Sequence, residues 1–145
     1  MKLASTHAKT LVRNHIYTRT LSAGETAARI KMGLRVSEFD TLRELLGLTV
    51  DALAKKVGIS IATLSRRRRS AEVLDAEHGD RIMRFARLYR LARDLYDGDE
   101  TAARNWLTKP ARALDGQTPL DYADTEVGAR EVENLIGRLE HGVYT

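Results

Sequence analysis

Four consecutive arginines, Arg66 to Arg69, are the densest group of chemically active side chains in this sequence. Guanidinium groups bind nucleic-acid phosphates and can also make paired hydrogen bonds to the edge of a guanine. Ser60 and Thr63, just ahead of the run, carry hydroxyls that can bind phosphates or base edges. Because successive residues of a helix point in different directions, the four arginines cannot all face one ligand. We expect most of them to add salt-dependent affinity that is blind to base sequence.

The residues around the arginine run have the spacing of a helix-turn-helix. Ala54 is small where the two helices would cross, Gly58 permits a turn with positive φ, and Leu64 would lock the second helix against the first. In this motif the N-terminal end of the second helix enters the major groove of DNA. The candidate DNA contacts are therefore Ser60, Ala62, Thr63, Arg66, Arg67 and Arg69. The alternative is a plain helical hairpin with a solvated arginine face.

Charge divides the chain into two halves. Residues 1–73 hold 14 Lys and Arg against 6 Asp and Glu, a net charge of +8, whereas residues 74–145 hold 10 against 14, a net charge of −4. A basic half joined to an acidic half indicates two surfaces with different partners, one of them a polyanion.

Catalytic and metal-binding motifs are missing from the sequence. His7, His15, His78 and His141 are too scattered to predict a metal pair, and no His-Glu-x-x-His, Gly-rich phosphate loop or Gly-x-Ser-x-Gly occurs. Cysteine is absent, which excludes disulfides and thiol nucleophiles and suits a reducing cytoplasm. No apolar run approaches the roughly 18 residues of a membrane span, and we read no signal peptide. We expect neither an enzyme nor a cofactor.

The elements that must position these residues are helices. Apolar residues recur at spacings of three and four nearly everywhere, and no segment alternates long enough to predict a strand. Ser37 with Asp40 resembles a capping box, and Ile61 and Leu64 are expected to face inward. Helices are expected at 25–32, from 37 to Gly47, from Thr49 to Gly58, from Ser60, at about 75–96, from Asp99, from Thr118 and from Thr125 to Gly142.

This pattern predicts an all-α fold with four parts. Residues 1–37 form an N-terminal helical segment, 38–73 the helix-turn-helix region, 74–97 a long connecting helix and 98–145 a small C-terminal helical domain. The connecting helix should bury Tyr96 among other residues, and the C-terminal domain should bury Trp106 and Leu107. Val132, Leu135, Ile136 and Leu139 are spaced for burial on the last helix.

The C-terminal part carries a second, more specific pattern. It comprises Trp106-Leu107, Pro110, Leu114-Asp-Gly-Gln-Thr-Pro-Leu-Asp121, Thr125-Glu-Val-Gly128 and a final His141-Gly142. These residues resemble the toxin-binding domain of the MbcA/ParS/Xre antitoxin family. The resemblance extends from about Gly47 to the end of the chain, and its specific parts are Gly-x-Thr-Pro-Leu and Thr-Glu-x-Gly. Asp115 stands where that family usually has a second small residue.

The resemblance implies a function in two parts. An antitoxin of this family is encoded beside a RES-domain toxin that depletes cellular NAD, and it binds that toxin through its C-terminal domain. It represses its own operon through the helix-turn-helix and dimerises through its N-terminal part, so we expect a cytoplasmic homodimer within a larger toxin–antitoxin complex. The alternative is a helix-turn-helix transcriptional regulator whose C-terminal domain only dimerises or senses a ligand.

The toxin-binding residues are expected at the end of the last helix. We expect a toxin that consumes an anionic dinucleotide to have a pocket with cationic groups and an apolar slot, which a tail with one ring and one carboxylate would suit. A competing hypothesis places acidic side chains over the pocket instead, including Glu133. The candidate residues are Glu131, Glu140, His141, Gly142, Val143, Tyr144 and Thr145.

Overall fold

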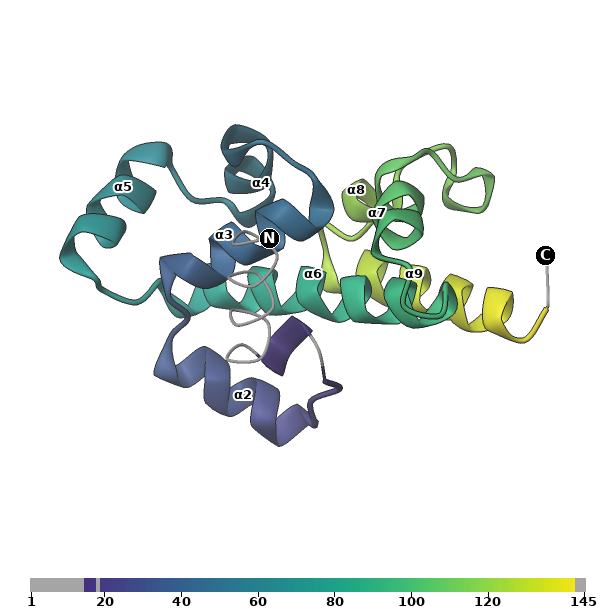
Figure 1. Cartoon of the computed structure of the whole chain (residues 1–145), viewed down its shortest axis with the longest axis horizontal. Helices are drawn as coiled ribbons and strands as arrows, with labels where there is room; N and C mark the ends of the chain where they lie inside the picture. Colours follow the sequence, from purple (N-terminus) through teal and green to yellow (C-terminus); the bar gives the residue numbers. More distant parts are fainter. Residues whose placement is uncertain (1–14, 18, 143–145) are drawn as a thin grey trace, which may run out of the picture. The chain divides into compact units, whose positions relative to one another are not determined.

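Every regular element in the described part of the chain, residues 15–17 and 19–142 of a computed structural model, is helical (Figure 1). The all-α fold class is confirmed. The elements are η1 (His15–Tyr17), α2 (Ala23–Met32), α3 (Val36–Leu46), α4 (Val50–Val57), α5 (Ile61–Ser70), α6 (Ala76–Leu95), α7 (Glu100–Thr108), η2 (Arg112–Leu114), α8 (Pro119–Tyr122) and α9 (Glu126–Glu140). None of these helices combines the length and the apolar character needed to cross a membrane.

The chain forms two compact units that meet in sequence between Ala86 and Arg87. The first unit holds η1 to α5 and the beginning of α6, and the second holds the rest of α6 and everything after it. The candidate DNA-binding residues belong to the first unit and the candidate toxin-binding residues to the second.

Side-chain caps set where most of the helices begin. In each case a hydroxyl or carboxylate accepts a hydrogen bond from the backbone N–H three residues on, which satisfies a donor that the helix leaves free. Pro119 follows its cap at the start of α8, where its missing N–H is not needed. The capping residues are Ser22, Thr49, Ser60, Asp99, Thr118 and Thr125.

The start of α3 differs from the sequence prediction. The helix begins at Val36, and the N-cap position is held by Arg35, whose backbone N–H donates to Glu38 Oε2 at 3.0 Å. Ser37 and Asp40 therefore lie inside the first turns and do not form a capping box. Val36 is buried, so the helix must start early enough to carry this apolar residue into the core.

The core of the first unit is built on α3. Phe39, Leu42 and Leu46 are fully buried along one side of this helix, which contacts both α4 and α5. The α4–α5 turn is closed by Gly58 with φ of 79°, where a Cβ would collide with Arg81 of α6. Arg81 Nη1 donates to the Val57 carbonyl at 2.9 Å, so the turn and α6 are tied together.

The first residue of α5 was wrongly expected in the core. Leu64 is buried, but Ile61 is 43% exposed. Ile61 is the first residue of α5, three positions before Leu64, and Leu64 is the one buried residue of this helix.

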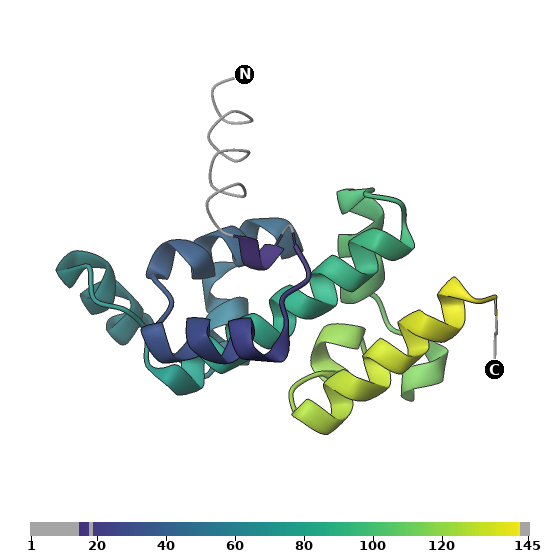
Figure 2. The same ribbon diagram turned by 90° about the horizontal axis from the view of Figure 1, so that it is seen from below.

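In the second unit, α8 contacts both α7 and α9 (Figure 2). The buried residues of this unit include Leu107, Leu120, Val132, Leu135 and Ile136. Three expected core residues, Tyr96, Trp106 and Leu139, stay partly exposed, Tyr96 at 37%. They lie near the ends of α6, α7 and α9, where fewer side chains surround each helix. The last helix ends at Glu140, with His141 as its C-cap and Gly142 in the left-handed conformation.

Candidate functional site

The helix α5 divides its side chains between two faces. Ala62, Arg66 and Arg69 follow one another at spacings of four and three residues, which places them on one side of the helix, and all three are exposed. Arg68 lies one turn after the buried Leu64, so these two share the opposite side. The arginine run is therefore divided between a side that faces solvent alone and a side that faces the protein, where the Arg68 side chain is still 49% exposed.

Arg66 and Arg69 are available to a ligand. Both are exposed, and neither makes a hydrogen bond or ion pair with any residue that the structure describes. They lie at the C-terminal half of α5, whereas the hydroxyls lie at its start. Ser60 accepts from the Thr63 N–H at 3.1 Å and donates its own proton to Thr63 Oγ1 at 2.8 Å. The Thr63 hydroxyl proton remains free to donate.

Arg67 is bound within the chain. Its guanidinium donates to the Val73 carbonyl at 2.6 Å and to Asp75 Oδ1 at 2.9 Å, and it lies 3.5 Å from Glu72 Oε2. Only 20% of its side chain is exposed. Arg67 thus holds the linker between α5 and α6, and its role as a DNA contact remains a prediction.

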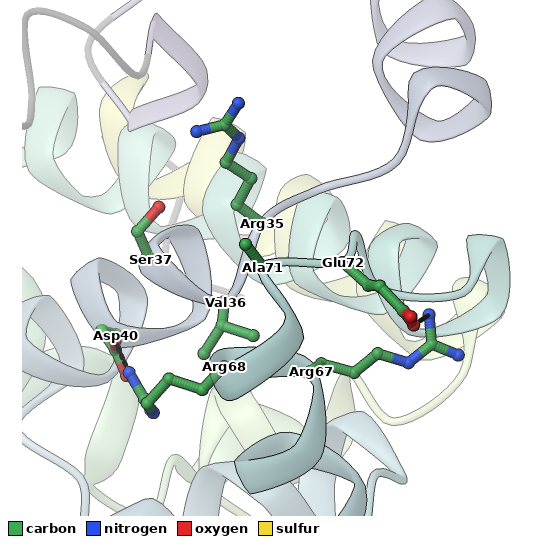
Figure 3. Close-up of a pocket in the computed structure, with 8 residues that line it drawn as sticks. All are labelled: Arg35, Val36, Ser37, Asp40, Arg67, Arg68, Ala71 and Glu72. Carbon is green, nitrogen blue, oxygen red and sulfur yellow. Dashed lines mark hydrogen bonds and ion pairs between the residues drawn. The ribbon is translucent and has the colours of Figure 1, made fainter.

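Arg68 is bound to α3. Its two terminal nitrogens donate to the two carboxylate oxygens of Asp40 at 2.6 and 3.0 Å (Figure 3). These hydrogen bonds raise the pKa of the Arg68 guanidinium above its ordinary value. The pair borders a hollow of about 320 Å³, lined by Arg35, Val36, Ser37, Asp40, Arg67, Arg68, Ala71 and Glu72.

Asp40 is the residue that the sequence reasoning missed. Its partner Arg68 was already left out of the candidate DNA contacts, and its spacing of four residues from Leu64, about one helical turn, agrees with that choice. No pattern along the chain joins Asp40 to Arg68, because they are 28 positions apart.

The acidic candidates on α9 separate in a similar way. Glu131 and Glu140 are exposed and unpaired among the described residues. Glu133 instead forms an ion pair with Arg87 of α6, which also donates to Glu126 at 3.0 Å. His141 and Gly142 are exposed directly after α9. The tail residues Val143, Tyr144 and Thr145 lie outside the described residues.

The groups with unusual environments do not assemble a catalytic centre. Burial, together with the nearby Glu100 carboxylate, raises the pKa of Tyr89 to about 12, so this phenol stays neutral inside the second unit. Within the described residues, no three His, Asp or Glu side chains gather as metal ligands. A further hollow, of about 410 Å³, is lined by Tyr96, Ala102, Asn105, Trp106, Lys109, Pro110 and Ala111.

Comparisons with known proteins match both halves of the chain. Residues 25–93 match the antitoxin Xre-like helix-turn-helix domain, and residues 91–142 match the antitoxin Xre/MbcA/ParS C-terminal toxin-binding domain. The chain is similar to the antitoxin Xre of Yersinia enterocolitica, with 37% identity over 80% of this chain and 78% of the relative. It is equally similar to the antitoxin Xre of Photorhabdus laumondii, with 37% identity over 81% and 80%.

A third relative is less similar in sequence. It is the Prs ADP-ribosylating antitoxin of a Sphingobium species, 23% identical over 79% of this chain and 77% of the relative. Both matched family models describe antitoxin domains. With a helix-turn-helix domain followed by a toxin-binding domain, this chain belongs to the Xre family of antitoxins.

Proposed function

We propose that this chain is the antitoxin of a type II toxin–antitoxin system, which binds and occludes a RES-domain toxin that depletes NAD. We also propose that it acts in the cytoplasm and represses its own operon. The observation that carries the proposal is the presence of both modules in one chain, with relatives named antitoxin Xre over about four fifths of its length.

The helix-turn-helix supports the repressor role. Arg66 and Arg69 are exposed cations on the helix that enters the major groove in this motif, and Thr63 has a free hydroxyl proton near its start. A homodimer, assembling further with the toxin, would read two half-sites of an inverted repeat. Arg67 contributes by holding the linker that follows α5.

The second unit supports the inhibitor role. Exposed carboxylates on α9, Glu131 and Glu140, can meet a cationic pocket entrance on the toxin. His141 and Gly142 continue that face toward the tail, where Val143, Tyr144 and Thr145 would enter the pocket. Glu133 is less suited to this role because Arg87 already neutralises it.

Expression of the chain together with the toxin-like gene beside its own gene tests the proposal. We expect the two proteins to purify as one complex and that complex to bind a DNA fragment carrying the operon's promoter. If the chain binds the promoter but does not co-purify with the product of the adjacent gene, the result would favour a helix-turn-helix transcriptional regulator without a toxin partner. That alternative has no structural observation in its favour, because the second unit matches a toxin-binding domain.

A further inference from the structure

The recognition helix α5 is weakly anchored by apolar contacts. Leu64 is the one buried residue of its ten, and its C-cap, Ala71, adopts a left-handed conformation with φ of 56°. By contrast, the preceding helix α4 buries Leu53, Ala54 and Val57. A helix fixed at a single apolar point can still pivot about that point, so other contacts must set its direction.

Polar contacts supply the second anchor at the far end of α5. Arg68 lies one turn beyond Leu64 on the same face, and its guanidinium donates to both carboxylate oxygens of Asp40 on α3 (Figure 3). Two parallel hydrogen bonds fix direction as well as distance, which a single contact does not. Asp40 itself sits between Phe39 and Thr41, both buried, so its position on α3 is well defined.

We propose that Asp40 and Arg68 are positioning residues that set the direction of α5 for DNA binding, without touching the DNA themselves. Leu64 and Arg68 hold the inner face, so that Arg66 and Arg69 are presented together on the outer face. This inference rests on the proposed DNA-binding function and deepens it by assigning a separate task to Arg68 within the arginine run.

Charge alone and the proposed positioning role predict opposite changes in DNA affinity when the Asp40 carboxylate is removed, so one substitution distinguishes them. Removal of a carboxylate near a DNA-binding surface should strengthen binding, since it removes repulsion from phosphates and frees a guanidinium. If Asp40 orients α5, however, Asp40→Asn weakens binding despite the gain in net positive charge. Asn also lacks the second acceptor oxygen that the paired geometry requires.

The experiment compares wild type, Asp40→Asn and Asp51→Asn on a labelled duplex carrying the operon's promoter and on a random duplex of equal length. Asp51 is an exposed carboxylate on α4 with no partner among the described residues, so Asp51→Asn is a matched control for charge. We expect Asp40→Asn to bind the promoter about threefold to tenfold more weakly, in line with a partly exposed but bidentate pair. Asp51→Asn should bind equally or more tightly.

Two further readouts separate positioning from general damage. Arg68→Gln should weaken binding to the same extent as Asp40→Asn, with the slope of affinity against salt unchanged, because Arg68 binds no phosphate. The doubly exchanged variant Asp40→Arg/Arg68→Asp should recover part of the affinity. All measurements are made well below the melting temperature of each variant, which circular dichroism establishes.

The outcomes distinguish a failure of the proposed repressor function from a failure of the positioning role of Asp40 and Arg68. A wild type that binds neither duplex overturns the proposed repressor function and this inference with it. A wild type that binds the promoter while Asp40→Asn binds as tightly or more tightly overturns the positioning pair alone. A salt slope reduced by about one in Arg68→Gln would instead make Arg68 a phosphate contact.

Discussion

Gly128 of α9 lies against the carbonyl oxygen of Tyr122 at the end of α8, so closely that a Cβ on Gly128 would overlap this oxygen. The backbone of Gly128 is helical and not left-handed, so space rather than conformational freedom demands glycine here. The Thr125 hydroxyl accepts from the Gly128 N–H at 3.0 Å and fixes the same turn. The Thr-Glu-x-Gly pattern therefore encodes a close helix approach in the toxin-binding domain.

Gly128→Ala should destabilise the second unit by about 1–3 kcal/mol, because α9 must move away from α8 to admit the methyl group. Gly137→Ala on the same helix is the matched control. Apart from the helix's own backbone and the two chain neighbours, no atom of the described residues lies within 4 Å of a Cβ at Gly137, so the change should stabilise the helix by about 0.5–1 kcal/mol. Urea unfolding of both variants gives the two free energies, and equal effects would contradict the packing described.

The helices could be predicted from the sequence because their signals are local. Ser60, Thr118 and Thr125 cap the helices that the sequence assigned to them, and each cap needs only the next three residues. The start of α3 was misplaced because Ser37 looks like a cap, while the burial of Val36 depends on the rest of the core. Tertiary packing decided that boundary.

Arg66→Ala/Arg69→Ala should weaken promoter binding by about 1–3 kcal/mol if one of the two arginines contacts a base. The slope of affinity against salt should also fall by up to about two, roughly 0.9 for each phosphate that is no longer neutralised. Arg112→Ala/Arg130→Ala removes the same charge from exposed sites of the second unit and should leave the slope unchanged. A titration in which both double variants match the wild type would remove α5 from the DNA interface.

The candidate site could be predicted only in part, for a geometric reason. The exposure of Ala62, Arg66 and Arg69 follows from helical spacing around Leu64, which the sequence displays. The partners of Arg67 and Arg68 depend on where α3 and the α5–α6 linker fold back, and residue spacing does not contain that information. Glu133 was open to the same error, since its partner Arg87 is on another helix.

Burial of Glu38 raises the pKa of its carboxyl above the ordinary value of 4.5, although the nearby Arg29 guanidinium and the Arg35 N–H oppose the shift. The folded chain then holds this proton more tightly than the unfolded chain, so stability falls as pH rises from 4.5 through the folded pKa. Glu38→Gln cannot titrate at this position. In urea unfolding, the stability of wild type relative to this variant should decrease as pH rises above 4.5; an increase would show that the ion pair with Arg29 dominates.

Deletion of residues 142–145 should separate binding of the toxin from protection against it. If Tyr144 enters the toxin's pocket, the truncated chain still co-purifies with the toxin but no longer prevents NAD loss. Glu131→Gln/Glu140→Gln with an intact tail should mainly weaken binding to the toxin, because α9 then carries less negative charge. Full protection by the truncated chain would assign inhibition to the acidic side chains alone.

The most direct test is the NAD content of cells that express the RES-domain toxin proposed as the partner from a foreign promoter, with and without this chain. We predict that NAD falls with the toxin alone and stays at the uninduced level when the wild-type chain is present. Arg66→Ala/Arg69→Ala should protect equally well, since DNA binding is not needed under that promoter. An equal fall in NAD with and without the chain, at matched toxin levels, would contradict its assignment as the toxin's inhibitor.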